Sequence, residues 1–281
     1  PSFAFPFFEI NKFDQRRINH LKSVDGIIVA SKWAKEIIKE HVDVPPALVS
    51  VIPLGVDSTI FQKGPHQITD KCVFFNCGKW EKRKGHDILL EMFKQAFPNE
   101  KDVELWMMCS NPFLSPQTGF AKVAHEWERY YRSDPRVKLI DRVPTHAEVA
   151  DIMSQTNCGV FPSRAEGWNL ELLEMMSMGK DVITTNYSAH TEFCTADNAY
   201  LIEIENLEKA EDGLFFDGSS GEWASLEGKP FSQGVEYMRN FYEKWKKDAN
   251  QYNTEGIKTA ERLSWDRTAQ HIEDTIYGNQ G

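Results

Sequence analysis

One stretch of the sequence decides the fold: Asn157–His190, NCGVFPSRAEGWNLELLEMMSMGKDVITTNYSAH. It begins with a short apolar run, Cys158–Pro162, which is typical of a buried strand in a parallel sheet. Leu, Glu and Met then predominate over Asn169–Met178, which predicts a helix, and Gly179 follows where a left-handed residue commonly ends one. A second strand is expected from Asp181. The order strand, loop, helix, strand predicts one unit of an α/β fold.

The loop before this helix lies at the carboxyl end of a predicted parallel strand, where open α/β sheets bind ligands. It carries Glu166, and Glu174 follows inside the helix with seven residues between the two. Both carboxylates could face one pocket at the helix N-terminus. The backbone N–H groups of Trp168, Asn169 and Leu170 are expected there as free donors, which favour a bound anion. A phosphate site beside carboxylates that can hold hydroxyl groups suits a nucleotide sugar.

A basic loop follows an earlier predicted strand, Cys72–Cys77, and contains four Lys or Arg residues within six positions. A run of charges is usually a solvated surface. This loop, however, joins a strand to a helix, so it would lie at the same sheet edge as Glu166. Phosphates between its cations and a helix N-terminus would be well neutralised. The pattern therefore favours phosphate binding by Lys79 and Lys84 and leaves the role of Arg83 open.

The two acids also permit a different chemistry. Retaining glycosidases use two carboxylates about 5 Å apart. Glu174 lies among Leu and Met residues, and a carboxylate in such a helix is costly unless it is paired or holds a ligand. Glu171 is expected to be an ordinary surface residue. The residues alone thus leave ligand binding and hydrolysis by a carboxylate pair open.

Composition and missing motifs exclude several functions. The chain has 281 residues and a net charge of −10, which argues against a general nucleic-acid binder. No apolar run approaches the ~18 residues of a membrane span, and five cysteines, mostly in apolar runs, favour reduced thiols in a cytoplasmic protein. Spacings typical of a metal site, a serine nucleophile or an ATP phosphate loop are absent from the sequence. We therefore expect no bound metal.

Strands and helices alternate along the remaining chain, which predicts a doubly wound parallel sheet of the Rossmann-like α/β type. Residues 1–57 are expected to form a minimal or truncated N-terminal lobe, because few elements precede the polar, turn-rich segment 58–70. That segment is expected to be a linker to the larger domain, 71–262. A closing helix is expected within 263–281.

Several of these stretches resemble the donor-binding half of retaining glycosyltransferases of family 4, which have the GT-B fold. The matching runs are Gly78–Trp80, Arg83–Asp87, Pro162–Glu174, Val51–Asp57 at the interdomain linker and Ser264-Trp265 at the closing helix. The similarity extends from about Asp25 over nearly the whole chain. The pair of acids combined with the basic loop is specific, whereas either motif alone would be weak.

The resemblance implies a role for each matching residue of the basic loop and of the loop before the helix. Lys79 and Lys84 would bind the donor diphosphate and offset the charge of the leaving nucleotide. Gly78 and Arg83 would belong to the same donor-binding loop. Glu166 would hold hydroxyl groups of the transferred sugar.

The resemblance also implies contacts with the rest of the donor. Glu174 would hold the ribose hydroxyls, and backbone groups of Trp168, Asn169 and Leu170 would meet the sugar and the pyrophosphate. Arg142 and Val143 would lie beside the base.

The implied activity is metal-independent transfer of a sugar, with retention of configuration, from a UDP- or GDP-linked donor to a sugar, glycan or other hydroxyl acceptor. No further cofactor is implied, and electrostatic stabilisation of the departing diphosphate would be the main catalytic effect. Two departures stand out. Many members have Arg where Lys79 stands, and Lys cannot make the same bidentate phosphate contact. The acceptor half is truncated, so residues 1–50, a partner or a missing domain would supply the acceptor site. A non-catalytic nucleotide-sugar binding module is the alternative.

Overall fold

The computed structural model describes residues 1–64 and 70–278. Part of the expected linker, 58–70, and the last three residues of the expected closing segment therefore lie outside the described residues. The division into domains at that linker stays a prediction. No helix in the described ranges is long and apolar enough to cross a membrane.

Six parallel strands form the main sheet, in the spatial order β6-β5-β4-β7-β8-β9. They are β4 (Cys72–Gly78), β5 (Val103–Cys109), β6 (Val137–Leu139), β7 (Cys158–Phe161), β8 (Asp181–Thr185) and β9 (Tyr200–Ile202). The chain builds outward from β4 to β6 and then returns to place β7 on the other side of β4. The predicted doubly wound α/β fold is thus confirmed, and its topological switch point lies between β4 and β7.

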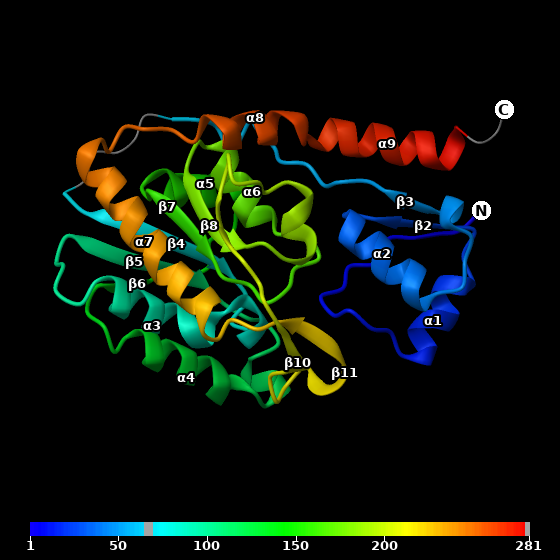
Figure 1. The fold of residues 1–281 in the computed structure, drawn as a ribbon, viewed down its shortest axis with the longest axis horizontal. Coiled ribbons are helices and arrows are strands. Elements are labelled where there is room, and N and C mark those ends of the chain that lie inside the picture. Colours follow the sequence, from blue (N-terminus) through cyan, green and yellow to red (C-terminus); the bar gives the residue numbers. More distant parts are fainter. Residues whose placement is uncertain (65–69, 279–281) are drawn as a thin grey trace.

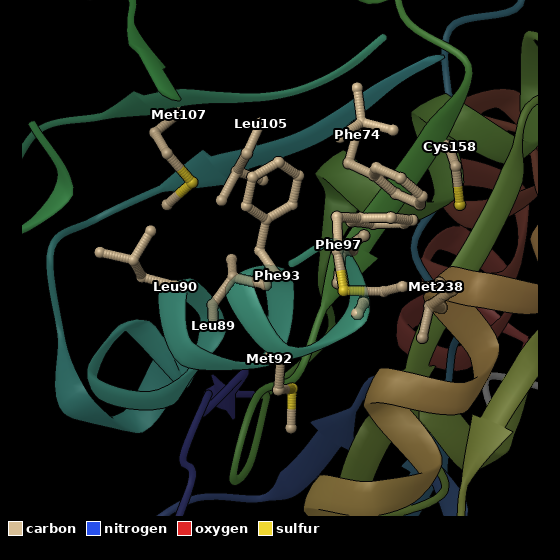
Figure 2. Packing of buried hydrophobic residues seen from close by; sticks show 14 of the residues in the cluster. Phe74, Leu89, Leu90, Met92, Phe93, Phe97, Leu105, Met107, Cys158 and Met238 are labelled. Atoms are coloured by element: carbon tan, nitrogen blue, oxygen red, sulfur yellow. The ribbon is translucent and has the colours of Figure 1, made fainter. Parts of the chain in front are cut away.

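Helices cover both faces of this sheet (Figure 1). On one face lie α3 (His86–Ala96), α4 (Ala121–Tyr131) and α7 (Lys229–Lys247), and on the other α5 (His146–Ser154), α6 (Leu170–Ser177) and α8 (Thr254–Arg262). Successive residues of a strand face opposite sides of the sheet. Phe74 therefore packs in the core on the side of α3, and Phe75 in the core on the side of α6. Figure 2 shows Phe93 of α3, and Phe97 just after this helix, lying against Phe74, with Met238 of α7 beside them.

The N-terminal lobe has its own small sheet, with the parallel order β1-β2-β3. Its elements are β1 (Phe3–Ala4), α1 (Gln15–Lys22), β2 (Gly26–Val29), α2 (Lys32–His41) and β3 (Val49–Val51). Phe8, Phe13 and Ile38 are among the residues of its separate core.

The chain returns to this lobe at its end. The backbone N–H of Val56 donates to the Leu263 carbonyl (2.8 Å), and the Thr268 hydroxyl donates to the Pro53 carbonyl (2.8 Å). The final helix, α9 (Trp265–Tyr277), then passes β3, and Thr275 shares a surface pocket with Ser50 (Figure 1). A helix thus lies within 263–281, the segment expected to carry the closing helix.

An antiparallel hairpin lies beside the carboxyl edge of the main sheet. It consists of β10 (Leu207–Glu211) and β11 (Asp217–Ala224), and was not expected from the sequence. Arg164 attaches it to the domain, because its backbone carbonyl accepts from Ala224 N–H (3.0 Å) and its Nε donates to Glu208 (2.7 Å). The hairpin therefore has a fixed position near the loops that follow β4 and β7.

Candidate functional site

Two loops meet at the switch point of the sheet, one after β4 and one after β7. The backbone N–H of Arg164 donates to the Arg83 carbonyl at 2.7 Å. Gly85 has a φ of 75°, and a Cβ there would lie 2.2 Å from the Pro162 carbonyl oxygen. Only glycine combines this backbone conformation with so close an approach. The prediction that the basic loop and the Glu166 loop share one sheet edge is therefore confirmed.

Arg83 joins the two loops through a buried network of ion pairs. Its Nη1 donates to Glu166 Oε2 (2.9 Å) and to the Ala165 carbonyl (2.8 Å). Its Nη2 donates to Glu81 Oε2 at 2.7 Å. The side chains of Arg83, Glu81 and Glu166 are all buried. Buried charges of this kind need paired partners, and here each of them has one.

Lys84 completes the network from the other side of Glu166. Its Nζ lies 3.0 Å from Glu166 Oε1, which also accepts from the Ser163 hydroxyl at 2.8 Å. Burial alone would raise the pKa of Glu166, but the charges of Lys84 and Arg83 outweigh it and hold that pKa well below its ordinary value. Burial opposes the charge on Lys84, yet Glu166 and Glu171 raise its pKa above the ordinary value. Lys84 therefore keeps its positive charge although it is buried.

A pocket of about 520 Å³ opens beside these loops, at the carboxyl ends of β4, β5 and β6. Six residues predicted for the site line it: Gly78, Lys79, Arg83, Lys84, Arg142 and Val143. Lys79 and Arg142 are exposed at its rim, whereas Lys84 is buried in its wall. The pocket thus brings four cationic side chains from two separate segments, the basic loop and the loop after β6, to one cavity.

The remaining predicted residues lie behind or beside the pocket wall. Glu166 reaches it only through its partners Arg83 and Lys84. The Trp168 ring is in the core, 4.8 Å from the Phe193 ring, and within the described residues its indole N–H is buried without a hydrogen-bond partner. Its side chain therefore serves packing, while its backbone remains beside the start of α6.

Asn169 starts α6 in a left-handed conformation, with a φ of 93°. Its Oδ1 accepts from the Leu172 N–H (3.2 Å), and its Nδ2 donates to His190 Nε2 (2.9 Å). Burial lowers the pKa of His190 to about 4, so the ring is neutral and can accept this hydrogen bond. The side chain of Asn169 thereby fixes the direction of the helix N-terminus, and Leu170 is the first residue of the helix.

The two glutamates of α6 differ from the expectation. Glu171, expected to be an ordinary surface residue, lies in the pocket wall, whereas Glu174 lies one turn further along and is not among the lining residues. Burial, and then the charge of Glu171, raises the pKa of Glu174 to about 8. Residues three apart share a helix face, so this spacing was the signal in the sequence that both acids point the same way.

His86 supports the conformation of the basic loop, a role that was not predicted from the sequence. Its Nδ1 accepts from the Glu81 N–H (3.2 Å), and its Nε2 lies 3.0 Å from Asn76 Oδ1. Burial and the charge of Lys84 lower its pKa to about 3, so the ring is neutral. Asn76 in turn donates to the Val160 carbonyl (2.7 Å), which connects the basic loop to β7.

The described residues contain no group of three or more His, Cys, Asp or Glu side chains that could hold a metal ion. All five cysteines are free. The positive charge gathers at the carboxyl ends of the parallel strands, close to helix N-termini. This arrangement suits an anionic phosphate ligand.

Solved structures with this fold confirm the architecture. HepE from Anabaena, in complex with UDP and glucose, superposes with a TM-score of 0.70 and 15% identity, covering 98% of this chain and 71% of that one. Sucrose-phosphate synthase from Thermosynechococcus elongatus superposes with a TM-score of 0.66 and 17% identity, covering 95% and 62%. These structures are GT-B glycosyltransferases, and the GT-B fold expected from the sequence is thereby confirmed.

Curated proteins with similar sequences are longer than this chain. The phosphatidylinositol N-acetylglucosaminyltransferase GPI3 subunit of Saccharomyces cerevisiae is 27% identical over 173 residues, which are 59% of this chain and 36% of that protein. The D-inositol 3-phosphate glycosyltransferase of Corynebacterium kroppenstedtii is 24% identical over 188 residues, which are 60% and 41%. The chain thus spans about two fifths of the length of these relatives.

The family profile described as glycosyl transferases group 1 matches residues 71–214, slightly more than half of the chain. The matched range contains both loops of the switch point, the pocket beside them and the hairpin strand β10. The protein therefore belongs to the glycosyl transferases of group 1.

Proposed function

We propose that this chain carries the donor site of a retaining glycosyltransferase of family 4, which transfers a sugar from a UDP- or GDP-linked donor to a hydroxyl acceptor. The observation that carries the proposal is the pocket at the switch point, where Lys79, Lys84 and Arg142 converge from the ends of different strands. A cavity so placed and so charged suits a diphosphate.

Lys84 and Lys79 would divide the work on the diphosphate. Lys84 is held in place by Glu166 and stays charged, so it is ready to stabilise the leaving group without reorganisation. Lys79 is exposed, so its flexible side chain can follow the phosphate as the donor enters. Gly78 allows the close approach of Lys84, whose Nζ would lie 3.2 Å from a Cβ at that position.

Carboxylates and backbone groups would hold the rest of the donor. Glu166 has three partners in Arg83, Lys84 and Ser163, which leaves one lone-pair site that would accept from a sugar hydroxyl. Glu174 would accept from the ribose hydroxyls, with the backbone of 168–170 meeting the sugar and pyrophosphate. Arg142 and Val143 would lie beside the base, in the pocket wall they share.

Transfer would break the bond from the anomeric carbon to the donor phosphate and form a bond to the acceptor oxygen on the same face. The acceptor proton would pass to the departing phosphate, so neither a metal nor another cofactor is required. Charge on the departing diphosphate would be stabilised by Lys79 and Lys84, the largest catalytic contribution.

The relatives support a UDP-linked donor and a divided acceptor site. HepE was solved with UDP and glucose, which makes UDP the first nucleotide to test. The yeast relative is described as a subunit, which supports a partner as one source of the acceptor site. A further N-terminal domain or residues 1–50 of this chain are the other two sources.

A second candidate is a nucleotide-sugar binding module that no longer transfers. Calorimetric titration with UDP and GDP tests the shared requirement, and no binding to either would refute both functions. Incubation with UDP-glucose then separates them. A transferase should hydrolyse the donor slowly or pass glucose to an added acceptor, whereas a binding module should leave the donor intact.

A further inference from the structure

A second pocket, of about 360 Å³, opens on the far side of the basic loop. Lys79 and Arg83 line both pockets, so the two cavities share a wall. The other lining residues come from distant segments: Glu9 from the N-terminal lobe, Phe113 from the connection after β5, and Phe215 and Phe216 from the turn of the hairpin. Four separate segments of the chain thus converge here.

One wall of this pocket is aromatic and exposed. The side chains of Phe113 and Phe215 are 53% and 44% exposed, and their ring centroids are 6.3 Å apart. Lys79 Nζ lies 5.3 Å from the centre of the Phe113 ring. Single exposed aromatic side chains are ordinary, whereas several that gather around a pocket are typical of a binding site.

The hairpin turn holds the aromatic wall in place. A single oxygen, Asp212 Oδ1, accepts from three successive backbone N–H groups, those of Leu214 (2.8 Å), Phe215 (2.7 Å) and Phe216 (2.9 Å). Lys82 Nζ donates to the Glu211 carbonyl at 3.0 Å, which ties this turn to the basic loop. The turn is therefore built in a fixed position before any ligand binds.

The opposite wall carries a carboxylate, that of Glu9, for which the described residues provide no hydrogen-bond donor at close range. Glu9 Oε1 lies 4.0 Å from Arg83 Nη2, which is longer than a hydrogen bond. Glu81 already occupies that nitrogen at 2.7 Å. Glu9 is half-buried and faces the pocket, so its oxygens can accept hydrogen bonds from a ligand hydroxyl.

We propose that this second pocket binds a pyranose ring of the acceptor, with the apolar face of the sugar on Phe113 and Phe215 and a hydroxyl donating to Glu9. This inference rests on the proposed function. The donor would bind in the first pocket and the acceptor in the second, on the two sides of the wall that Lys79 and Arg83 form. A pyranose ring has an apolar face of C–H groups and hydroxyl groups around its edge. It therefore matches a pocket with one aromatic wall and one carboxylate wall.

Ligand-observed NMR on the whole chain tests the proposal. The probes are the methyl α-D-glycopyranosides of glucose, mannose and galactose, each measured with and without UDP. Phe215→Ala and Glu9→Gln should each weaken binding of the best glycoside at least about threefold, because one removes the apolar platform and the other a charged acceptor. Phe120→Ala, which removes a 45% exposed ring outside the pocket, should leave it unchanged.

Two results would overturn the proposal: no binding of any of the three glycosides to the wild type, or equal binding to the wild type, Phe215→Ala and Glu9→Gln. Circular dichroism of each variant confirms that the fold is retained. UDP titration of the same samples reports on the donor site alone. Failure of the donor site would thus appear as lost UDP binding, whereas failure of the second pocket would appear only with the glycosides.

Discussion

Glu166 and Glu174 belong to one sequence motif, yet their surroundings give them opposite electrostatic character. Lys84 and Arg83 contact Glu166 directly and keep it ionised. Glu174 is also buried, but there burial and the neighbouring Glu171 raise its pKa to about 8. A carboxyl group in that state can donate as well as accept a hydrogen bond near neutral pH.

The raised pKa of Glu174 predicts a specific pH dependence of stability. An unfolded chain ionises this carboxyl near its ordinary pKa of 4.5, whereas the folded chain holds the proton up to about pH 8. Between these values ionisation favours the unfolded state, so the wild type should lose stability relative to Glu174→Gln as pH rises from about 5 to about 8. Urea denaturation across this range measures the difference.

Glu171→Gln serves as the control for that experiment. Removing the neighbouring charge takes away the second cause of the raised pKa, so the loss of stability with pH should become smaller. A free-energy difference between wild type and Glu174→Gln that stays constant over the whole range would show that the carboxyl is not perturbed.

Single substitutions in the proposed donor site should weaken nucleotide binding by the cost of a lost charged hydrogen bond. Lys84→Ala and Glu174→Ala should each reduce the affinity for UDP or GDP by about 1.5–3 kcal/mol in calorimetry. Lys82→Ala is the matched control, because Lys82 lies in the same loop but donates to the hairpin instead. Unchanged affinity in both test variants would place the site elsewhere.

Among the elements, the two loops at the switch point depend on a contact that only glycine allows. Gly85 lies at the N-terminus of α3 and brings the basic loop against Pro162. The Arg83 to Glu166 ion pair spans the same junction. The position of the cations therefore follows from backbone packing as well as from charge.

Gly85→Ala should destabilise the protein strongly. The new Cβ would meet the Pro162 carbonyl at 2.2 Å in a left-handed conformation, so two loops must move apart. We expect a loss of at least about 2 kcal/mol in the free energy of unfolding. Gly119→Ala is the matched control: its φ is also positive, at 81°, but nothing lies within 4 Å, so it should cost only the backbone strain, about 1 kcal/mol. Equal losses in the two variants would contradict the close approach.

The sequence was sufficient for elements whose apolar pattern is unbroken. β4 and β7 are buried along nearly their whole length, so composition alone marked them. The hairpin was missed because three of the five residues of β10 are charged and β11 is rich in Gly and Ser, and neither composition is typical of a strand. Its strands are held by Arg164, a contact between distant segments that no local pattern reveals.

The candidate site was predictable in part, because the strands that carry its loops were predictable. Loops that follow parallel strands share an edge, so the meeting of Lys84 with Glu166 followed from the fold. Which glutamate of α6 lines the pocket depends on how the helix is rotated against the sheet, and packing alone decides that. The position of Glu9 at the second pocket could not be predicted, because it depends on where the N-terminal lobe lies against the larger domain.

At the scale of the whole molecule, the N-terminal lobe is docked against the larger domain and contributes to the second pocket. The backbone N–H of Lys32, at the start of α2, donates to Glu192 Oε2 at 2.7 Å, and the rings of Trp33 and Tyr187 are 5.9 Å apart. This docking places Glu9 at the second pocket. The arrangement gives each lobe a share in the proposed acceptor subsite.

Glu192→Ala should lower the free energy of unfolding by about 1 kcal/mol, because an anion at a helix N-terminus satisfies a free N–H and interacts with the helix dipole. Lys32→Ala is the control, since it removes only an exposed ammonium and keeps the backbone donor. Chemical denaturation measures both. The larger loss should be that of Glu192→Ala; the reverse order would show that the side-chain ion pair holds the lobes instead.

A crystal structure of this chain with bound UDP tests the central claim most directly. The account predicts the diphosphate in the first pocket, within hydrogen-bond distance of Lys84 and Lys79 and close to the N-terminus of α6. Diphosphate density in the second pocket, or away from both lysines, would contradict it.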